Sequence, residues 1–546
     1  MASNACSASL RRSPLVMSRS APGTRRAGLL VPLFSVPSTR SWGIGEFADL
    51  PRLAEWLRQA RQRIVLMLPL SEMPPDETSP YSSLSAMALS SQFIALDDVE
   101  DFTTIGGEAA LEPELKGRLD AARGSPTIDY ANVRDLKQIA LQRSFARFQR
   151  EEWTRDTRRA SLLRTYITAQ AWWLDDYALF RALQSRHGER VWHDWPEPIR
   201  SRDTDALSSA RAELTDEILY WQYVQWIADR QWAAARAAAD DLAVFGDLPF
   251  AVGAESADVW AHQDEFRLDL SIGVPPDAFS ATGQDWRLPA YRWDVLASRD
   301  FSLLRQRARR LADLFDGCRL DHLVGFFRMY TRPITGGEGT FTPAEQWEQQ
   351  QLGERILGLF LETRAEIIAE DLGVVPDFVR ESLARLAIPG YKVFRWERHW
   401  HTPGRPFKDP IDYARMAVAT SGTHDTEPLV IWWENAPVEE RRAILEIGSV
   451  RERLNADERT TAIDAKHLSA TVRDALLESL FASGADLLVL PIQDVFGWRE
   501  RINQPATVGP HNWTWKLPWP SDRMISVPNA LTAAKRLRDW AERHDR

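Results

Sequence analysis

The stretch GCRLDHLVGF, residues 317–326, places three residues capable of chemistry inside an otherwise apolar run: Arg319, Asp321 and His322. A guanidinium beside a carboxylate favours the ionised carboxylate, which is the form that acts as a nucleophile or binds a cation. A structural ion pair at the end of a buried strand would explain the same residues without any chemistry. The remaining acidic residues have to distinguish these interpretations.

Further polar residues lie at the ends of other apolar runs. Asp247 ends one run, Glu370 and Asp371 end a second, and His424 and Asp425 end a third. If these runs are parallel strands, their carboxyl ends meet at one edge or mouth of the sheet. The sequence therefore predicts that several carboxylates converge on one site.

Converging carboxylates can bind a hard cation such as Mg²⁺ or Ca²⁺, or they can carry out acid and base catalysis. Arg319 favours the second reading, because a guanidinium beside a metal ion would add repulsion. Glycoside cleavage with retention needs an ionised nucleophile and a protonated acid, roles that Asp321 and Glu370 fit. The apolar approach EIIAED would desolvate Glu370 and raise its pKa. Adjacent strand residues point to opposite faces, so Asp371 is expected to be a structural hydrogen-bond partner.

Eight short apolar runs would position these residues. They are rich in Val, Leu, Ile and Phe with little alternation, which is typical of strands buried on both faces of a parallel sheet. The runs are 27–36, 63–70, 241–252, 318–327, 365–373, 391–398, 415–425 and 485–494. Because amphipathic helical segments separate several of them, the pattern predicts an α/β fold, a (β/α)8 TIM barrel. An open doubly wound sheet is the alternative that counting leaves open.

The interval between the second and third runs contains strongly helical segments such as TDEILYWQYVQWIADRQWAAARAAA. We predict a large, mainly helical insertion around 72–239 within a single catalytic domain, residues 27–546, because no long linker separates a second domain. Residues 1–26 are rich in Ser, Ala and Arg, and they contain no acidic residue. This composition predicts a disordered N-terminal extension. An organelle transit peptide, or an upstream start codon with Met17 as the other start, are the alternative explanations of the segment.

Composition excludes several classes of function. The chain of 546 residues is 44% hydrophobic and 26% charged, as in ordinary globular proteins, and no stretch is apolar enough to span a membrane. The formal net charge of −10 argues against a nucleic-acid partner, which requires a basic surface. Cys6 and Cys318 are the two cysteines and match no zinc pattern, so no metal is predicted and a reducing cytoplasm fits best. The oligomeric state is left open.

Aromatic content favours a sugar ligand. The chain has 23 tryptophans, and their flat faces with an N–H at the edge suit pyranose rings. Trp172, Trp173, Trp221 and Trp226 recur at helical spacing and need only a core to explain them. Trp286 differs, because FSATGQDWRLPAY reads as a loop in which a large aromatic would otherwise be exposed.

The motifs CRLDH, IIAEDLG and GTHDT together resemble the nucleophile, acid/base and stabiliser regions of the amylomaltases. These are the 4-α-glucanotransferases of glycoside hydrolase family 77, within the α-amylase superfamily. GIGEFADL, SPYSSLSAMAL, GDLPFAV, ESADVW, GVPPDAFSATGQDW and NWTW are similar to further family motifs, in family order. The resemblance extends from about residue 27 to about residue 516.

The resemblance implies that Asp321 is the nucleophile, Glu370 the acid and Asp425 the stabilising third carboxylate. The implied activity is retaining transfer of α-1,4-glucan segments between maltooligosaccharides or starch- and glycogen-derived chains, without a cofactor. Hydrolysis of α-1,4-glucans by the same residues is the first alternative. A catalytically silent glucan-binding protein is the last, since it would have no need of all three carboxylates.

The resemblance also implies a set of supporting residues. Arg319 and His424 match positions that support the nucleophile and the bound sugar, and Asp247 matches the first conserved region of the superfamily. The substrate-contacting loop positions are matched by Tyr81, Gln284 and Trp286. Departures from the family pattern are expected mostly at the rim of the site, at Leu66, Ser90, Ser91, Arg287, Leu288 and Val324.

Overall fold

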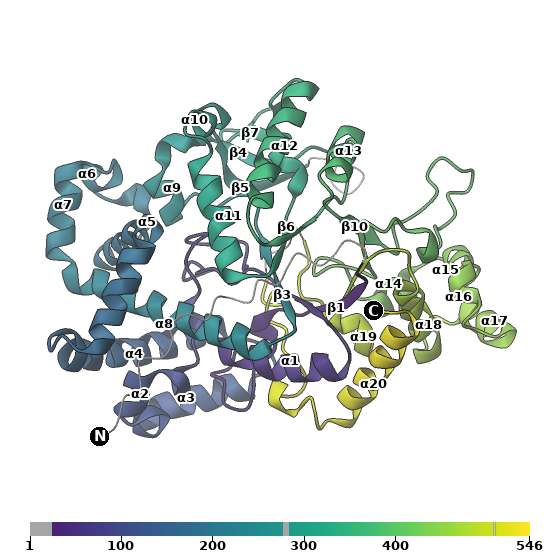
Figure 1. Cartoon of the computed structure of the whole chain (residues 1–546), viewed down its shortest axis with the longest axis horizontal. Helices are drawn as coiled ribbons and strands as arrows, with labels where there is room; N and C mark the ends of the chain where they lie inside the picture. Colours follow the sequence, from purple (N-terminus) through teal and green to yellow (C-terminus); the bar gives the residue numbers. More distant parts are fainter. Residues whose placement is uncertain (1–23, 277–282, 506, 508) are drawn as a thin grey trace, which may run out of the picture.

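The computed structural model describes residues 24–276, 283–505, 507 and 509–546. The predicted extension at 1–26 therefore lies almost entirely outside the described residues, as does part of the GVPPDAFSATGQDW motif. Eight parallel strands close into a barrel in the order β1-β12-β11-β10-β9-β6-β3-β2 (Figure 1). They are β1 (Arg26–Leu30), β2 (Ile64–Leu66), β3 (Ala243–Leu248), β6 (Gly317–Leu320), β9 (Glu366–Ala369), β10 (Gly390–Val393), β11 (Ala417–Thr420) and β12 (Leu487–Pro491). Each predicted apolar run contributes to one of these strands, so the (β/α)8 prediction is confirmed.

The barrel strands form where the sequence is apolar without alternation, because both of their faces are covered. Every residue of β3, β6 and β12 is buried. Strands β3 and β6 pair in a register that sets Asp247 directly beside Arg319. Gly317 allows this close approach, since a Cβ there would lie 2.6 Å from the ring of Phe245. Packing at one end of the two strands thus fixes the pairing of charges at the other.

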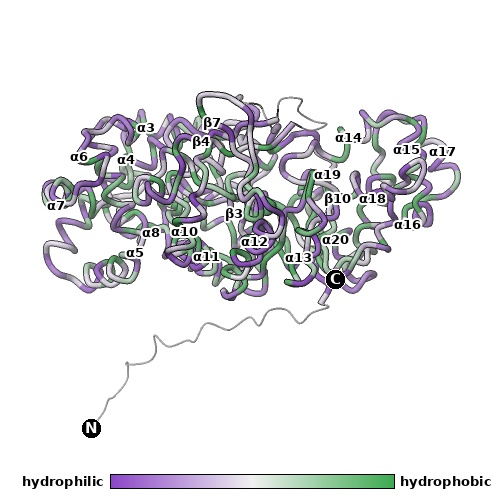
Figure 2. Tube along the Cα trace, turned by 90° about the horizontal axis from the view of Figure 1, so that it is seen from above, coloured by the Kyte–Doolittle hydropathy of each residue, from purple (hydrophilic) through white to green (hydrophobic). Residues whose placement is uncertain are grey.

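Helices cover the barrel and extend from it on two sides. Figure 2 shows α4–α8 at one end of the molecule and α14–α18 at the other, with the barrel between them. The helices between β1 and β3 are α1 (Leu50–Gln59), α2 (Glu100–Thr104), α3 (Pro113–Gly124), α4 (Tyr130–Phe148), α5 (Arg158–Arg186), α6 (Glu197–Arg200), α7 (Thr204–Glu213) and α8 (Thr215–Ala239). Seven of these, α2 to α8, occupy the interval in which a helical insertion is predicted.

The remaining helices lie between or after the other barrel strands. They are α9 (Ala257–Ala261), α10 (Trp293–Ser298), α11 (Ser302–Leu314), α12 (Gln346–Leu361), α13 (Asp377–Arg385), α14 (Leu429–Asn435), α15 (Val438–Leu445), α16 (Gly448–Arg451), α17 (Ala456–Asp464), α18 (Ala470–Phe481), α19 (Ile492–Phe496) and α20 (Pro528–Arg543). Within the described ranges, no helix is both long and apolar enough to cross a membrane.

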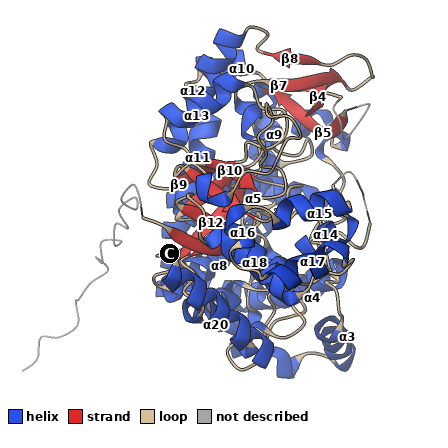
Figure 3. Ribbon diagram, turned by 90° about the vertical axis from the view of Figure 1, so that its right-hand side faces the viewer, coloured by secondary structure: helices blue, strands red, loops and turns tan. Residues whose placement is uncertain are grey.

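A second, antiparallel sheet stands apart from the barrel, as Figure 3 shows. Its order is β5-β4-β7-β8, and its strands are β4 (Phe266–Val274), β5 (Gln284–Tyr291), β7 (Met329–Pro333) and β8 (Thr340–Thr342). The prediction of a loop around Trp286 is therefore wrong, because Trp286 lies on β5. Neighbouring Gly283 and Pro289 gave the segment the composition of a loop, whereas pairing with β4 makes it a strand.

Candidate active site

Three carboxylates follow three different barrel strands and open toward one end of the barrel. Asp321 follows β6, Glu370 follows β9, and Asp425 lies in the loop after β11. The backbone N–H of Asp321 donates to the carbonyl of Leu248, and that of Glu370 donates to the carbonyl of Leu320. The barrel's hydrogen bonding thus extends to both residues. The side chains of Asp321 and Asp425 remain accessible to solvent, at 27% and 41% exposed.

Arg319 joins Asp321 to a buried carboxylate beneath it. Its Nη1 lies 2.9 Å from Oδ1 of Asp321 and donates to both oxygens of Asp247, at 2.8 and 2.7 Å. Burial raises the pKa of Asp247 to about 6, although the charge of Arg319 opposes that rise. The hydroxyl of Tyr81 also donates to Asp247, at 2.8 Å. With no exposed side-chain surface, Asp247 positions these two residues and does not face the opening.

Glu370 lies against the backbone that carries Asp321. Its Oε2 accepts a hydrogen bond of 2.8 Å from the N–H of His322, and its Oε1 accepts one of 3.3 Å from the N–H of Leu372. Burial raises the pKa of Glu370 to about 7; Arg319 opposes this rise and Asp321 adds to it. Glu370 is thus able to hold a proton near neutral pH, as its apolar approach predicts.

His322 adopts an unusual backbone conformation at this point. Its φ of +43° lies in the left-handed region, which costs a non-glycine residue conformational energy. This conformation turns the chain directly after Asp321 and aims the N–H of His322 at Glu370. Burial also lowers the pKa of the His322 imidazole to about 4, so the ring is neutral at physiological pH.

The third carboxylate, Asp425, is held from two sides. Its Oδ2 lies 3.3 Å from Nε2 of His424, and its Oδ1 accepts a hydrogen bond of 2.6 Å from Asn503. Burial alone would raise the pKa of Asp425, but the charge and hydrogen bond of His424, together with Asn503, lower it to about 2. His424 is buried, and its ring stacks on Tyr81 at 5.4 Å. Asp425 is therefore ionised throughout the ordinary pH range.

The antiparallel sheet brings two more predicted residues to the same opening. The ring of Trp286 lies edge to face with that of His322, with 4.6 Å between centroids. The indole N–H of Trp286 donates to the side-chain oxygen of Gln284 at 3.2 Å. Both residues belong to β5, so this sheet forms a wall beside His322, the residue that follows Asp321.

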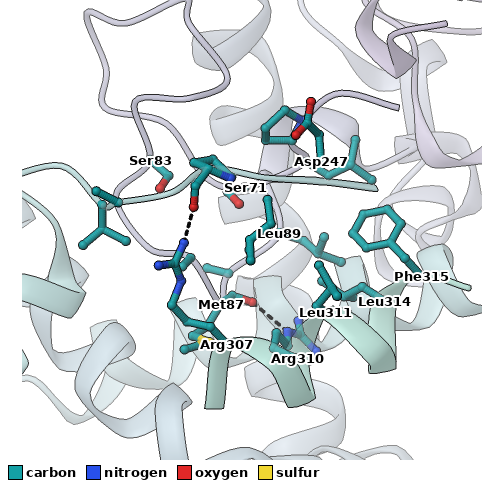
Figure 4. Close-up of a pocket in the computed structure, with 18 residues that line it drawn as sticks. Ser71, Ser83, Met87, Leu89, Asp247, Arg307, Arg310, Leu311, Leu314 and Phe315 are labelled. Carbon is teal, nitrogen blue, oxygen red and sulfur yellow. Dashed lines mark hydrogen bonds between the residues drawn. The ribbon is translucent and has the colours of Figure 1, made fainter. Parts of the chain in front are cut away.

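Behind Asp247 lies a small cavity of about 30 Å³, which is large enough for one or two waters. Figure 4 shows Asp247 on one side of this cavity and Arg307 and Arg310 on the other. Arg307 donates to the carbonyl of Pro249, and Arg310 donates to that of Met87 at 2.7 Å. The first bond fixes the chain directly after β3 and thereby supports the position of Asp247, whereas the second ties α11 to the loop after β2.

Some residues near the site lie outside the apolar runs that predict the barrel strands, so that pattern does not indicate them. Asn503 contacts Asp425, Arg501 donates to the Asp425 carbonyl at 2.7 Å, and Trp513 packs on His424 at 5.8 Å. All three lie in the irregular segment after α19, where no periodicity marks the chain. The NWTW motif is the one sequence feature that indicates part of this segment.

The six positions that depart from the family pattern differ in exposure: two are buried, three are half-buried and one is exposed. Leu66 and Ser90 are fully buried, so these two are exceptions to the expectation that the departures lie mostly at the rim. Leu66 is the last residue of β2, and Ser90 caps a short helical turn by accepting a bond from Gln92. Arg287 is exposed on β5 next to Trp286, and it has a φ of +56°. Among the six, Arg287 is the one with an exposed side chain.

Among the described residues, no group of three or more His, Cys, Asp and Glu side chains has a metal-binding arrangement. At Asp321 the compensating positive charge is supplied by Arg319, which also contacts the buried Asp247.

Comparison with known proteins identifies the family to which the chain belongs. Residues 31–522 match the family model for 4-alpha-glucanotransferase. The chain belongs to the 4-alpha-glucanotransferase family. It is 33% identical to the 4-alpha-glucanotransferase of Thermus thermophilus over 509 residues, covering 90% of this chain and 95% of the relative. It is 30% identical to that of Chlamydia pneumoniae over 502 residues, covering 90% and 91% of the two chains.

A solved structure agrees with this assignment. The amylomaltase from Streptococcus agalactiae in complex with acarbose superposes with a TM-score of 0.77 at 26% identity, covering 96% of this chain and 99% of that one. The predicted amylomaltase resemblance and barrel fold are thus confirmed. The enzyme is a transglycosidase of the 4-alpha-glucanotransferase type, and the hydrolase alternative is not favoured.

Proposed function

We propose that the enzyme transfers α-1,4-glucan segments between maltooligosaccharides, or starch- and glycogen-derived chains, through a covalent glucosyl-enzyme on Asp321. One observation carries this assignment. Asp321, held by Arg319, is accessible at 27%, and the next backbone N–H binds Glu370, whose pKa is raised to about 7. A carboxylate and a protonated acid side by side are what retaining cleavage requires.

In the first half-reaction, Glu370 gives its proton to the glycosidic oxygen as the bond from that oxygen to C1 breaks. An oxygen of Asp321 forms a bond to C1, so the donor segment becomes an ester and the remaining glucan leaves with a free 4-hydroxyl. In the second half-reaction, the 4-hydroxyl of an acceptor attacks C1 and Glu370 takes its proton. The ester bond breaks, and Asp321 returns to a carboxylate.

The remaining residues support the charge that develops during these steps. Asp425, with a pKa of about 2, supplies a fixed negative charge opposite an oxocarbenium-like ring, and it accepts hydrogen bonds from sugar hydroxyls. We assign His424 and Tyr81 to the same bound sugar. Gln284 and Trp286 provide an edge and a face against which a further pyranose can rest.

We further propose that residues 27–546 act as one catalytic unit, in which the helices of 72–239 and the antiparallel sheet surround the barrel mouth. A cytoplasmic location fits a sequence with two cysteines, of which the described Cys318 is buried and unpaired.

Incubation with maltotriose tests the reaction class. Transfer gives glucose together with maltooligosaccharides both shorter and longer than the substrate, whereas hydrolysis gives shorter products and an equivalent rise in reducing ends. We expect longer products to form before the total number of reducing ends increases. A product mixture without any oligosaccharide longer than maltotriose would contradict the proposal.

The covalent step has a separate test. In Glu370→Gln the acid is absent, but a glucosyl fluoride needs no protonated leaving group and still forms the ester. Rapid quenching followed by peptide mass spectrometry should find glucose on the peptide containing Asp321. Label on Asp425 or Asp371 would assign the nucleophile elsewhere.

A further inference from the structure

Asp425 differs from the other two carboxylates because it lies within a loop and not at a strand end. Asp321 and Glu370 directly follow β6 and β9, whereas Asp425 belongs to residues 421–428, which connect β11 to α14. We call this segment the Asp425 loop. The ladder of the barrel does not extend along it, so contacts with other elements have to set the position of Asp425.

Part of the order in the Asp425 loop is internal. Oγ1 of Thr426 accepts from the N–H of Thr423 and donates to the carbonyl of the same residue, both at 3.0 Å. The N–H of Asp425 donates to Oγ1 of Thr423 at 3.2 Å. These bonds shape the tip of the loop around Asp425, but they do not attach the loop to the barrel.

Arg395, which follows β10, attaches the loop from one side. Its Nε donates to the carbonyl of Ser421 at 3.2 Å, and its Nη1 donates to the carbonyl of Glu427 at 3.0 Å. Arg395 is 5% exposed, and its guanidinium lies 5.1 Å from the centre of the Trp432 ring on α14. One planar group thus joins the beginning of the Asp425 loop to its end.

Asp494, on α19, attaches the same loop from the other side. Its Oδ2 accepts from the hydroxyl of Ser421 at 2.5 Å, and its Oδ1 accepts from the N–H of Leu429 at 2.6 Å. Leu429 is the first residue of α14, which contacts α19 (Figure 1). Burial raises the pKa of Asp494, and the positive charge of Arg395 opposes that rise. The two buried charges therefore compensate each other.

The position of these two residues in the barrel explains why they reach the same loop. Strand β11 lies between β10 and β12, so the loop after β11 passes between the chain that carries Arg395 and the helix that carries Asp494. Gly422 permits a close approach, since a Cβ there would clash with Oγ1 of Thr426 and lie 3.2 Å from Nη2 of Arg395. Both side chains direct their bonds to residues that flank Asp425 on its two sides.

We propose that Arg395 and Asp494 are positioning residues of the reaction, which together hold the Asp425 loop closed so that Asp425 faces the bound sugar. The inference rests on the proposed function, in which Asp425 stabilises the oxocarbenium-like ring. Neither residue meets the substrate; both act through Asp425. Because a displacement of about 1 Å at a reacting centre can cost about 10²-fold in rate, a loosened loop should be visible in kcat.

Arg395→Met tests the clamp, because it keeps much of the bulk and removes both bonds. We expect kcat on maltotriose to fall by about 10²-fold, while the basic limb of the pH profile is unchanged because Glu370 lies on another loop. Arg441→Met is the matched control: Arg441 is also buried, and it donates to the carbonyl of Ala465, which follows α17. The control should keep the parental kcat. An equal fall in both variants would overturn the proposal, since it would reflect a general loss of packing.

A double-mutant cycle separates action through Asp425 from a general effect on the fold. Asp425→Asn removes the charge that the clamp positions, and a glucosyl fluoride donor needs no proton from Glu370, so low residual rates can be measured. We expect Arg395→Met to lower the parental rate on this donor by about 10²-fold and the rate of Asp425→Asn by less than about threefold. Equal factors in the two backgrounds would contradict the proposal.

Arg395→Lys decides the question if Arg395→Met does not fold. Lysine keeps the positive charge that Asp494 compensates, but its ammonium lacks the planar fork that fixes two carbonyls at a set spacing. We expect kcat about tenfold below the parent, again with little further loss when the change is made in Asp425→Asn. A parental kcat in Arg395→Lys would show that the fork of Arg395 is not needed and would overturn its role.

Hydrogen exchange measures the loop itself. Peptides spanning 421–429 should exchange faster in Arg395→Met and in Asp494→Ala than in the parent, whereas peptides spanning 318–327 should not change. Faster exchange at 421–429 without any loss of kcat would overturn the proposal, because closure of the loop would then not serve the reaction.

The products of the parent enzyme separate this inference from the proposed function. If the parent only hydrolyses maltotriose, the proposed transfer is rejected, but a shared fall in hydrolysis in Arg395→Met and Asp425→Asn would still support the inference. If transfer is normal and Asp425→Asn keeps the parental rate, transfer stands and the inference is overturned.

Discussion

Nη1 of Arg319 lies 2.7 Å from Oδ2 of Asp247, and the side chain of Asp247 has no exposed surface. The two residues are direct neighbours on adjacent strands, β3 and β6. Because the same nitrogen also lies 2.9 Å from Asp321, the buried pair sets the direction in which Arg319 meets the proposed nucleophile. The position of Arg319 in the CRLDH motif thus depends on Asp247, a carboxylate from another strand.

Asp247→Asn tests this dependence. Removing the buried negative charge weakens the bonds to Arg319, and we expect unfolding free energy to fall by about 2–3 kcal/mol, with kcat reduced more than KM is raised. Urea denaturation and initial rates on maltotriose measure both effects. Asp98→Asn is the control, because its pair with Arg40 is exposed and should contribute less than about 1 kcal/mol. Equal stability of both variants would mean that the buried pair does not support the site.

Asp321→Asn should abolish transfer with little change in folding. An amide of the same shape cannot form the ester, so we expect kcat to fall by at least about 10³-fold. Asp371→Asn provides the comparison: Oδ1 of Asp371 accepts from the N–H of Tyr391 at 2.7 Å, and an amide oxygen can accept the same bond. Transfer by Asp321→Asn within tenfold of the parent rate would remove it from the nucleophile role.

The pH dependence of kcat/KM should report Glu370. The acid must be protonated to act, and its pKa is about 7, so the rate should fall as pH rises above about 7. Initial rates on maltotriose across the pH range measure this basic limb. In Glu370→Gln the limb should be absent when a glucosyl fluoride is the donor. A basic limb that persists in this variant would belong to another group.

The barrel was predictable because its strands are buried on both faces and therefore read as unbroken apolar runs, as β3 and β12 do. The antiparallel sheet was not predictable on that basis. Strand β8 has three residues with no buried one among them, and the first half of β5 has no buried residue either. Pairing between distant segments stabilises these strands, and no local pattern records it.

The same division holds within the active site. Asp321 and Glu370 follow barrel strands directly, so their position is determined by elements that the sequence indicates. Asn503 reaches Asp425 from an irregular segment and Trp286 reaches His322 from the second sheet, contacts that depend on tertiary structure. A conformation such as that of His322, with φ at +43°, also has no signature in residue type.

Exhaustive chelation should leave turnover unchanged. The positive charge beside Asp321 and Asp247 comes from Arg319, which would repel a divalent cation at the same place. Rates on maltotriose before and after dialysis against a chelator measure the effect. Activity lost on dialysis and restored by Mg²⁺ or Ca²⁺ would favour a metal site at the carboxylates.

Arg287→Gly should affect both backbone strain and acceptor binding. Arg287 has a φ of +56°, and glycine adopts that conformation without the cost of about 1 kcal/mol that a side chain incurs. Because the unfolded chain also gains freedom, we expect a stability change within about 0.5–1 kcal/mol. Because we assign Trp286 to the bound glucan, we expect the exposed guanidinium next to it to meet an acceptor, and its loss to raise the acceptor KM and the share of hydrolysis.

Arg61→Gly is the matched control for this last change. Arg61 has a φ of +54° and an exposed side chain, but it lies between α1 and β2, at the end of the barrel opposite the carboxylates. It should show a similar small stability change with no effect on product distribution. The ratio of glucose released by water to glucan transferred, measured at several maltose concentrations, distinguishes the two variants. If Arg287→Gly leaves that ratio unchanged, the arginine affects only the conformation of β5 and not the choice between acceptor and water.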